Sequence, residues 1–183
     1  MASVYICFLR GVNVGGNKLL KMDALRTLCG SIGLSDAKTY LQSGNVVFRS
    51  STKPEQLIKK IEEGIRRSTG FEAKVILRSP DELRDAIAAN PFEGEREGNR
   101  LLIAFLDGAL SGEAKAALLK LKTDSEELHF AGRELYLYFH AGMADSKLAS
   151  ALTPKKLGVN VTARNWNTVN ALLKMGEEID RRG

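Results

Sequence analysis

"SVYICFLRG", residues 3–11, decides how this 183-residue sequence folds. Apolar side chains occupy both alternating positions of the stretch, which is typical of a central strand covered on both faces. "RLLIAFLDG", residues 100–108, has the same character, and the FLRG and FLDG that end the two stretches lie 97 residues apart. The two stretches therefore predict a chain built from two similar halves.

Both halves continue with the same order of elements. The first half predicts a helix over residues 22–32, a hairpin over 38–50 turning at Ser43-Gly44, a helix capped by Thr52 with Glu55, an edge strand over 72–78, and a helix capped by Ser79 with Glu82. The second half predicts a helix over 112–121 capped by Ser111, a hairpin over 127–140 turning at Gly132-Arg133, a helix over 144–152 capped by Asp145, a strand over 159–164, and a last helix.

This order predicts an α+β fold formed by tandem duplication of two ferredoxin-like βαββαβ units, each with a trailing helix and an antiparallel sheet. We expect the first subdomain over residues 1–92 and the second over residues 99–183. Because the first strand of each half is apolar on both faces, both faces of each sheet should be covered. We expect the halves to pack as one compact molecule.

The two halves differ most in the segment after their first strand. Gly44 and Gly132, the glycines of the two hairpins, lie only 88 residues apart, against 97 for FLRG and FLDG. The first half therefore carries about nine extra residues in this segment, and the loop "GVNVGGNK", residues 11–18, accommodates them. An extended loop on one copy of a repeat is more often functional than the short connector on the other.

The glycine-rich loop fails both standard phosphate-binding templates. In the pattern GxxxxGK[ST], Asn17 stands where the lysine must be and Leu19 replaces the serine or threonine. In the pattern GxGxxG, Asn13 occupies the middle glycine position. A loop able to turn backbone N–H groups toward an anion remains. Arg10, Asn13, Asn17 and Lys18 surround it, and Gly15 and Gly16 in the loop are further candidate ligands. The alternative is that glycine and asparagine only allow positive φ in a long connector.

Four blocks of the sequence together resemble a known family. These are "LRGVNVGGNKLLKMDAL", "TYLQSGNVVF", "SKL" and "KLGVNVTARNWNTVNALL", in this order and spread almost from end to end. They resemble the bacterial family catalogued as domain of unknown function 1697. The resemblance implies a two-part α/β fold in a cytoplasmic protein with no established activity. One departure is "GMAD" before "SKL", where members often carry a glycine-and-arginine turn, so a ligand could be bound differently here.

The family blocks add further candidate ligand-binding residues. In "TARNWNTV", Asn165 suits a helix N-cap and Trp166 suits the core, so Arg164 and Asn167 are left without an evident local role. Core and cap is one interpretation of this cluster, and ligand contact is the other. The remaining candidates are Asn45, Ser146, Lys147, Arg164, Asn165 and Asn167. For the last three, both interpretations stay open. Turn chemistry alone also explains the hairpin tip that contains Asn45.

The second hairpin carries both histidines of the chain. His129 should lie opposite Tyr136, with Tyr138 and His140 on the same face. Two histidines without nearby cysteines or paired carboxylates make a poor metal site, so we expect neither metal nor cofactor. An aromatic sheet face can stack RNA bases, but the signature of RNA-recognition sheets is absent and a covered sheet opposes this role.

Composition sets the remaining limits. The net charge of +5 mildly favours anionic partners, but the charges are dispersed, as in the helical i,i+4 pairs Glu62–Arg66 and Glu63–Arg67. The two cysteines, Cys7 and Cys29, are expected to be buried free thiols. With neither a signal peptide nor an apolar run long enough to span a bilayer, we expect a cytoplasmic protein without a membrane partner.

The preferred functional hypothesis is a protein that binds a small molecule or anion, such as a phosphorylated metabolite or a nucleotide. Whether it is also an enzyme stays open, since no nucleophile or acid–base pair stands out. Its pocket would combine Arg10, Asn13 and Lys18 with Arg164 and Asn167. The alternatives are an RNA-binding module and a non-catalytic interaction or assembly protein.

Overall fold

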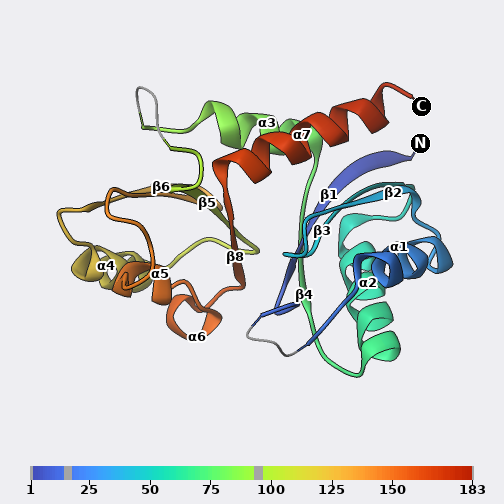
Figure 1. Cartoon of the computed structure of the whole chain (residues 1–183), viewed down its shortest axis with the longest axis horizontal. Helices are drawn as coiled ribbons and strands as arrows, with labels where there is room; N and C mark the ends of the chain where they lie inside the picture. The colour runs from blue at the N-terminus through green and yellow to red at the C-terminus, as the bar shows by residue number, and fades with distance from the viewer. Residues whose placement is uncertain (1, 15–17, 93–96, 183) are drawn as a thin grey trace. The chain divides into compact units, whose positions relative to one another are not determined.

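The structure, a computed structural model, describes residues 2–14, 18–92 and 97–182. By its internal contacts the chain divides into two compact units (Figure 1). Unit 1 comprises Met1–Arg84 and Ala171–Gly183, and unit 2 comprises Asp85–Asn170. Each unit contains one four-stranded sheet in which all neighbouring strands are antiparallel.

Unit 1 has the strand order β2-β3-β1-β4. Its elements up to β4 are β1 (Ser3–Arg10), α1 (Met22–Ser31), β2 (Ser35–Tyr40), β3 (Asn45–Ser50), α2 (Pro54–Thr69) and β4 (Lys74–Arg78). β1 is central, between β3 and β4, and β4 lies at an edge, as the sequence predicts. The core between the sheet and the helices α1 and α2 contains Cys7 and Leu9 of β1.

Unit 2 has the corresponding strand order, β6-β7-β5-β8. Its elements from β5 to β8 are β5 (Leu101–Leu106), α4 (Gly112–Leu121), β6 (Glu126–Ala131), β7 (Glu134–Phe139), α5 (Lys147–Ser150), α6 (Pro154–Leu157) and β8 (Val161–Asn165). β5 is central and all six of its residues are buried, which confirms the expectation for a strand apolar on both faces. Ala104 of β5 packs in one core with Ala114 and Leu118 of α4.

Two further helices, α3 (Pro80–Ala88) and α7 (Trp166–Asp180), contain the unit boundaries. In unit 1, α7 lies against the second face of the sheet, because a Cβ on Gly176 would come within 3.3 Å of Cδ1 of Ile6. In unit 2, the hydroxyl of Tyr136 donates a hydrogen bond of 2.7 Å to the carbonyl oxygen of Ala86 in α3. Helices therefore contact both faces of each sheet. The subdomain limits at residues 92 and 99 stay a prediction.

The register of the strands confirms the duplication. Ile6 of β1 pairs with Arg78 of β4, and Ile103 of β5 pairs with Arg164 of β8. Ile6 and Ile103 are related by the same 97-residue offset as FLRG and FLDG. The chain thus has the predicted α+β fold of two ferredoxin-like units, although the long helix α2 is replaced in unit 2 by the four-residue helices α5 and α6.

Several helix and turn predictions are confirmed by their hydrogen bonds. The amide of Ser79 donates to the carboxylate of Glu82 at 2.8 Å, and the amide of Glu82 donates to Oγ of Ser79 at 3.1 Å, so the capping box is formed. Ser111 accepts a hydrogen bond from the amide of Ala114, as an N-cap does. Ala131 pairs with Glu134, which leaves Gly132-Arg133 as the predicted two-residue turn.

Three local predictions are wrong. Thr52 does not cap α2, because Pro54 holds the preceding residue extended and so places Lys53 at the N-cap, one residue later than predicted. Asp145 does not cap the helix predicted over 144–152; Ser146 does, and that helix ends at Ser150. The first hairpin does not turn at Ser43-Gly44 alone: residues 41–44 lie between the strands, and both Leu41 and Gly44 have positive φ.

Gly44 provides a test of the close approach between the first hairpin and β1. A Cβ on Gly44 would lie 2.6 Å from Cγ2 of Val12 and 2.9 Å from Cβ of Leu9, whereas Gly70 has the same φ of 78° and open space around it. Gly44→Ala should lower the free energy of unfolding by about 2–4 kcal/mol, and Gly70→Ala by about 1 kcal/mol. Urea denaturation of the two variants measures the difference. Equal losses would contradict the close approach.

Candidate functional site

Asn13 organises the glycine-rich loop of unit 1. Its backbone amide donates to the carbonyl oxygen of Lys18 at 3.0 Å. Its side-chain Nδ2 donates to the carbonyl oxygens of Leu20, at 3.0 Å, and Gln42, at 2.7 Å, while Oδ1 accepts from the amide of Leu20 at 2.8 Å. Asn13 therefore closes the loop and joins it to the tip of the first hairpin. The predicted ligands Gly15 and Gly16 lie outside the described residues.

The same region holds most of the described non-glycine residues that have positive φ. Among the described residues, four non-glycine residues have positive φ, and three of them are Asn13 (53°), Lys18 (56°) and Leu41 (57°). Such conformations are uncommon for residues other than glycine and asparagine, and they persist only where surrounding contacts impose them. The hydrogen bonds of Asn13 supply such contacts to the two segments that carry Lys18 and Leu41.

Arg10 lies at the end of β1, directly before this loop. It is half-buried, and its cross-strand neighbour is Lys74 at the start of β4. Nζ of Lys74 is 3.2 Å from the Glu62 carboxylate, and Nζ of Lys18 is 3.5 Å from the carbonyl oxygen of Glu72. Among the residues that the structure describes, the Arg10 guanidinium has no hydrogen bond or ion pair. Arg10 is thus a cation beside another cation, with its donors available.

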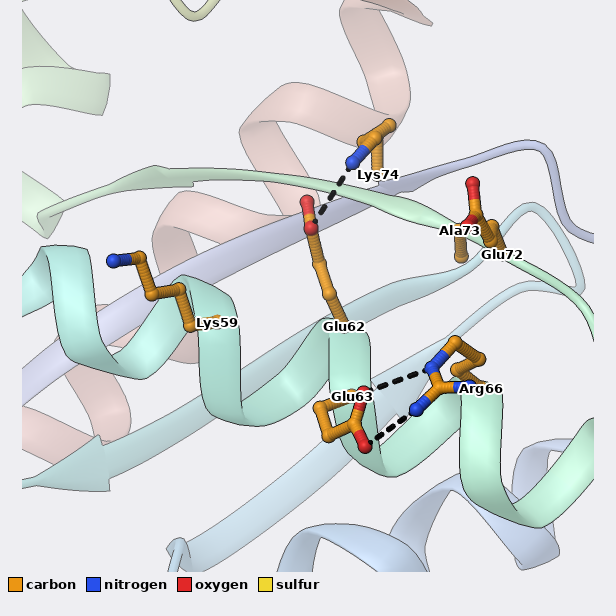
Figure 2. Close-up of a pocket in the computed structure, with 7 residues that line it drawn as sticks. All are labelled: Lys59, Glu62, Glu63, Arg66, Glu72, Ala73 and Lys74. Atoms are coloured by element: carbon orange, nitrogen blue, oxygen red, sulfur yellow. Dashed lines mark hydrogen bonds and ion pairs between the residues drawn. The ribbon is translucent and has the colours of Figure 1, made fainter.

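A mixed-charge cavity of about 340 Å³ lies between α2 and the start of β4 (Figure 2). The predicted pair Glu62–Arg66 does not form, because Glu62 instead reaches Lys74 and accepts from the amide of Val75 at 3.1 Å, on the edge strand. Arg66 binds Glu63, and hydrogen bonds from Arg66 and Arg67 lower the pKa of Glu63 to about 2. Most of the charged side chains that line this cavity are thus already paired with each other. The cavity therefore favours neither an anionic nor a cationic ligand.

The polar cluster at the end of β8, in unit 2, has mainly structural contacts. Oδ1 of Asn165 accepts from the amide of Thr168 at 2.8 Å, which confirms it as a helix cap. The Arg164 guanidinium is buried and donates to Oγ1 of Thr162, at 2.7 Å, and to the carbonyl oxygen of Ala163, at 2.8 Å. Asn167 is exposed, and its side chain packs so closely against Gly98 that no Cβ fits there.

Sequence reasoning missed Arg78, the counterpart of Arg164. Arg78 is only 2 % exposed, and its Nη1 donates to the carbonyl oxygen of Leu77 at 2.9 Å. Both arginines occupy the same register position and donate to the carbonyl of the residue before them. The signal that reveals the pair is the alignment of "RSP" at 78–80 with "RNW" at 164–166. Because both units contain it, this arginine belongs to the repeated fold.

Ser146 and Lys147 line a second cavity, of about 360 Å³, in unit 2. Oγ of Ser146 donates to the carboxylate of Glu126 and accepts from the amide of Ala149 at 3.0 Å. Glu126 is 5 % exposed and also accepts from the amide of Thr123 at 2.9 Å. Burial opposes ionisation of Glu126, but the hydrogen bonds from Ser146 and Thr123 outweigh it and lower the pKa of this carboxyl group. Ser146 and Glu126 thus join α5 to the start of β6.

The other candidate groups among the described residues give no second site. Nδ2 of Asn45 donates to the carbonyl oxygen of Tyr40 and to Oγ of Ser43, inside the hairpin tip. His129 lies opposite Tyr136, as predicted. Burial raises the pKa of the Cys29 thiol to about 11, so this thiol is unreactive. The described ranges contain no group of three or more histidine, cysteine or acidic residues that could hold a metal ion.

Comparison with known proteins identifies the family. The model of the family described as "Protein of unknown function (DUF1697)" matches residues 2–136, which include the glycine-rich loop and the first hairpin. The chain belongs to this family. This DUF1697 protein also resembles the solved structure of the conserved bacterial protein SP0830 from Streptococcus pneumoniae, at 23 % identity over 96 % of this chain and 99 % of that one, with a TM-score of 0.80. That similarity shows a shared fold. No curated protein matches the chain.

In this DUF1697 chain the predicted ligand residues fall into two groups. Unit 1 brings Arg10, Asn13, Lys18 and Asn45 to one end of its sheet, where β1 ends and β3 and β4 begin. Unit 2 contains the others, which are Ser146, Lys147, Arg164, Asn165 and Asn167. That both groups contribute to one pocket stays a prediction. No helix in the described part of the chain is long and apolar enough to cross a membrane.

The buried carboxylate of Glu126 predicts a pH-dependent contribution to stability. Its pKa is lower in the folded state than in the unfolded chain, so the stabilisation is present at neutral pH and is lost as the pH falls through the folded-state pKa. Glu126→Gln should therefore cost about 1–3 kcal/mol at pH 7, and less once wild-type Glu126 is protonated. Urea denaturation at neutral and acid pH measures both values. The exposed Asp124→Asn is the control, and a cost that does not change with pH would contradict the assignment.

Proposed function

We propose that this protein binds a small anion, of the class of phosphorylated metabolites and nucleotides, at the end of β1 where Arg10 meets the glycine-rich loop. The observation that supports it is the state of Arg10, a half-buried residue whose guanidinium has no hydrogen bond or ion pair among the described residues. A guanidinium forms its strongest hydrogen bonds with a group of opposite charge. Its planar set of donors matches a phosphate or carboxylate group in two-point contact.

The surroundings of Arg10 strengthen the case for an anion. Lys74 lies directly across from Arg10, and like charges in this position repel each other. Glu62 compensates Lys74, but no described acid compensates Arg10. Lys18 adds a third cation next to Glu72, which is two residues before Lys74. An anion bound at Arg10 would reduce this repulsion and supply the opposite charge that Arg10 lacks.

The burial of the aromatic residues disfavours the alternative of an RNA-stacking sheet. Tyr136 is 1 % exposed and Tyr138 is 7 % exposed. The hydroxyl of Tyr136 donates to the carbonyl oxygen of Ala86, and burial with the nearby charge of Glu134 raises its pKa to about 12. Rings covered in this way offer no face for a base. RNA binding would have to use the charged surface instead, with a strong dependence on salt.

Thermal unfolding with a ligand panel tests the proposal. Inorganic phosphate, nucleotides, sugar phosphates and short RNAs are added at low salt to wild type, Arg10→Gln and the control Arg67→Gln. A ligand at about 100 times its dissociation constant should add roughly 2.7 kcal/mol of stability to wild type and to Arg67→Gln. Arg10→Gln should lose this gain while its own melting temperature stays equal or rises, because the repulsion with Lys74 is removed.

The outcomes separate the three functional hypotheses. A phosphate compound that stabilises Arg10→Gln as strongly as wild type would place the anion elsewhere and refute the site. Stabilisation by RNA alone would favour the nucleic-acid alternative. A lower melting temperature of Arg10→Gln, together with no response of wild type to any ligand, would give Arg10 a structural role and favour an interaction or assembly protein.

A further inference from the structure

The same end of unit 1 exposes a cluster of aliphatic side chains. Among the described residues, five large hydrophobic side chains are exposed, and three of them are Val14 (67 %), Leu19 (69 %) and Leu41 (55 %). Each of the three is next in sequence to Asn13 or to a residue that is hydrogen-bonded to Asn13. Val14 follows Asn13, Leu19 precedes Leu20, and Leu41 precedes Gln42. One asparagine therefore holds the three segments that carry these side chains together. We call the three residues the aliphatic tip.

The fold does not require these side chains to be apolar or exposed. Leu41 has a φ of 57°, a conformation in which asparagine or glycine would be more stable than leucine. Unit 2 makes the equivalent connections with the short segment before α4 and with the two-residue turn Gly132-Arg133. An apolar residue kept exposed in an unfavourable conformation indicates contact with a partner.

Positive charge surrounds the aliphatic tip. Lys18 and Lys21 flank Leu19 in sequence, and both are exposed. Neither lysine has an ion pair among the described residues, and Nζ of Lys18 donates to the backbone carbonyl oxygen of Glu72. The one acid between residues 9 and 28, Asp23, is already bound to Arg26. The partner should therefore combine negative charge with an apolar interior.

We infer that the aliphatic tip binds the surface of an anionic phospholipid bilayer, with Val14, Leu19 and Leu41 entering the interface and Lys18 and Lys21 contacting the headgroups. A few aliphatic side chains flanked by lysines are sufficient for attachment to a bilayer. A stable protein interface instead buries about 800 Å² on each partner and is depleted in lysine. A second copy of the chain would bring like charges together. Attachment to the surface of a bilayer does not need an apolar run long enough to span it.

Co-sedimentation with vesicles tests this inference. The vesicles contain phosphatidylcholine either alone or with about 30 % phosphatidylglycerol, at low and high salt. Wild type should bind only the anionic vesicles, and binding should weaken as salt screens the lysines. Leu19→Ser should reduce binding about tenfold. Leu119→Ser, at a side chain of α4 that is also exposed, should bind like wild type.

Leu41→Asn separates a binding role from a structural one. Asparagine tolerates positive φ, so this variant should unfold at the same temperature as wild type or a higher one. Its binding to anionic vesicles should nevertheless fall about tenfold. A variant that is more stable and binds less cannot be explained by misfolding. Lys18→Gln and Lys21→Gln should each weaken binding about fivefold and reduce its dependence on salt.

Four results would overturn the inference. In the first two, wild type does not bind anionic vesicles, or it binds vesicles of phosphatidylcholine alone equally well. In the third, both Leu19→Ser and Leu41→Asn bind anionic vesicles as strongly as wild type. In the fourth, wild type binds polyglutamate as strongly as the vesicles, and this binding does not depend on Leu19. The last would assign the surface to an acidic protein. The vesicle experiment is decided by the losses at Leu19 and Leu41, and the phosphate screen is decided by the loss at Arg10, so the two proposals can fail separately.

Discussion

The burial of β1 and β5 on both faces is the constraint on which each unit depends. In β1, Ile6 and Cys7 are adjacent residues on opposite faces, and they are 0 % and 1 % exposed. A sheet with helices on one face only would leave Ile6 in water. In unit 1 the C-terminal part of α7 contacts this second face, and the absence of a side chain at Gly176 allows the helix backbone to approach Ile6 closely. The last residues of the chain therefore belong to the unit that its first strand begins.

Periodicity and turn chemistry predicted most of the fold because they act over a few residues. The apolar runs of β1 and β5, the turn at Gly132-Arg133 and the capping box of Ser79 with Glu82 all depend on near neighbours. Predictions that depended on one exact position were less secure. Pro54 fixes where α2 begins, and this moved the cap from Thr52 to Lys53. Glu62 is bonded to residues of β4 and not to the predicted partner on its own helix.

The location of the candidate site is a prediction from the sequence, and the contacts of its residues could not be predicted in the same way. A loop present in one half of a duplication indicated where to look. Nothing local shows that Asn13 makes four hydrogen bonds, since its partner Gln42 lies in another segment. The same limit applies to Arg164, whose burial depends on the sheet and not on its neighbours in sequence. Distant contacts determine which polar residues are engaged by the fold and which remain available to a ligand.

Comparison of the two units distinguishes arginines that belong to the repeated fold from one that does not. Arg78 and Arg164 occur at equivalent positions in both units, so the repeated fold accounts for them. Arg10 has no such counterpart, because the equivalent residue of unit 2 is Asp107. Asp107 accepts hydrogen bonds from the backbone amide of Asn160, at 2.8 Å, and from its side chain, at 2.6 Å. Unit 2 thus satisfies this position with an internal contact. Unit 1 instead places there a cation without a described partner, next to its extended loop, and the proposed anion site would explain this difference between the units.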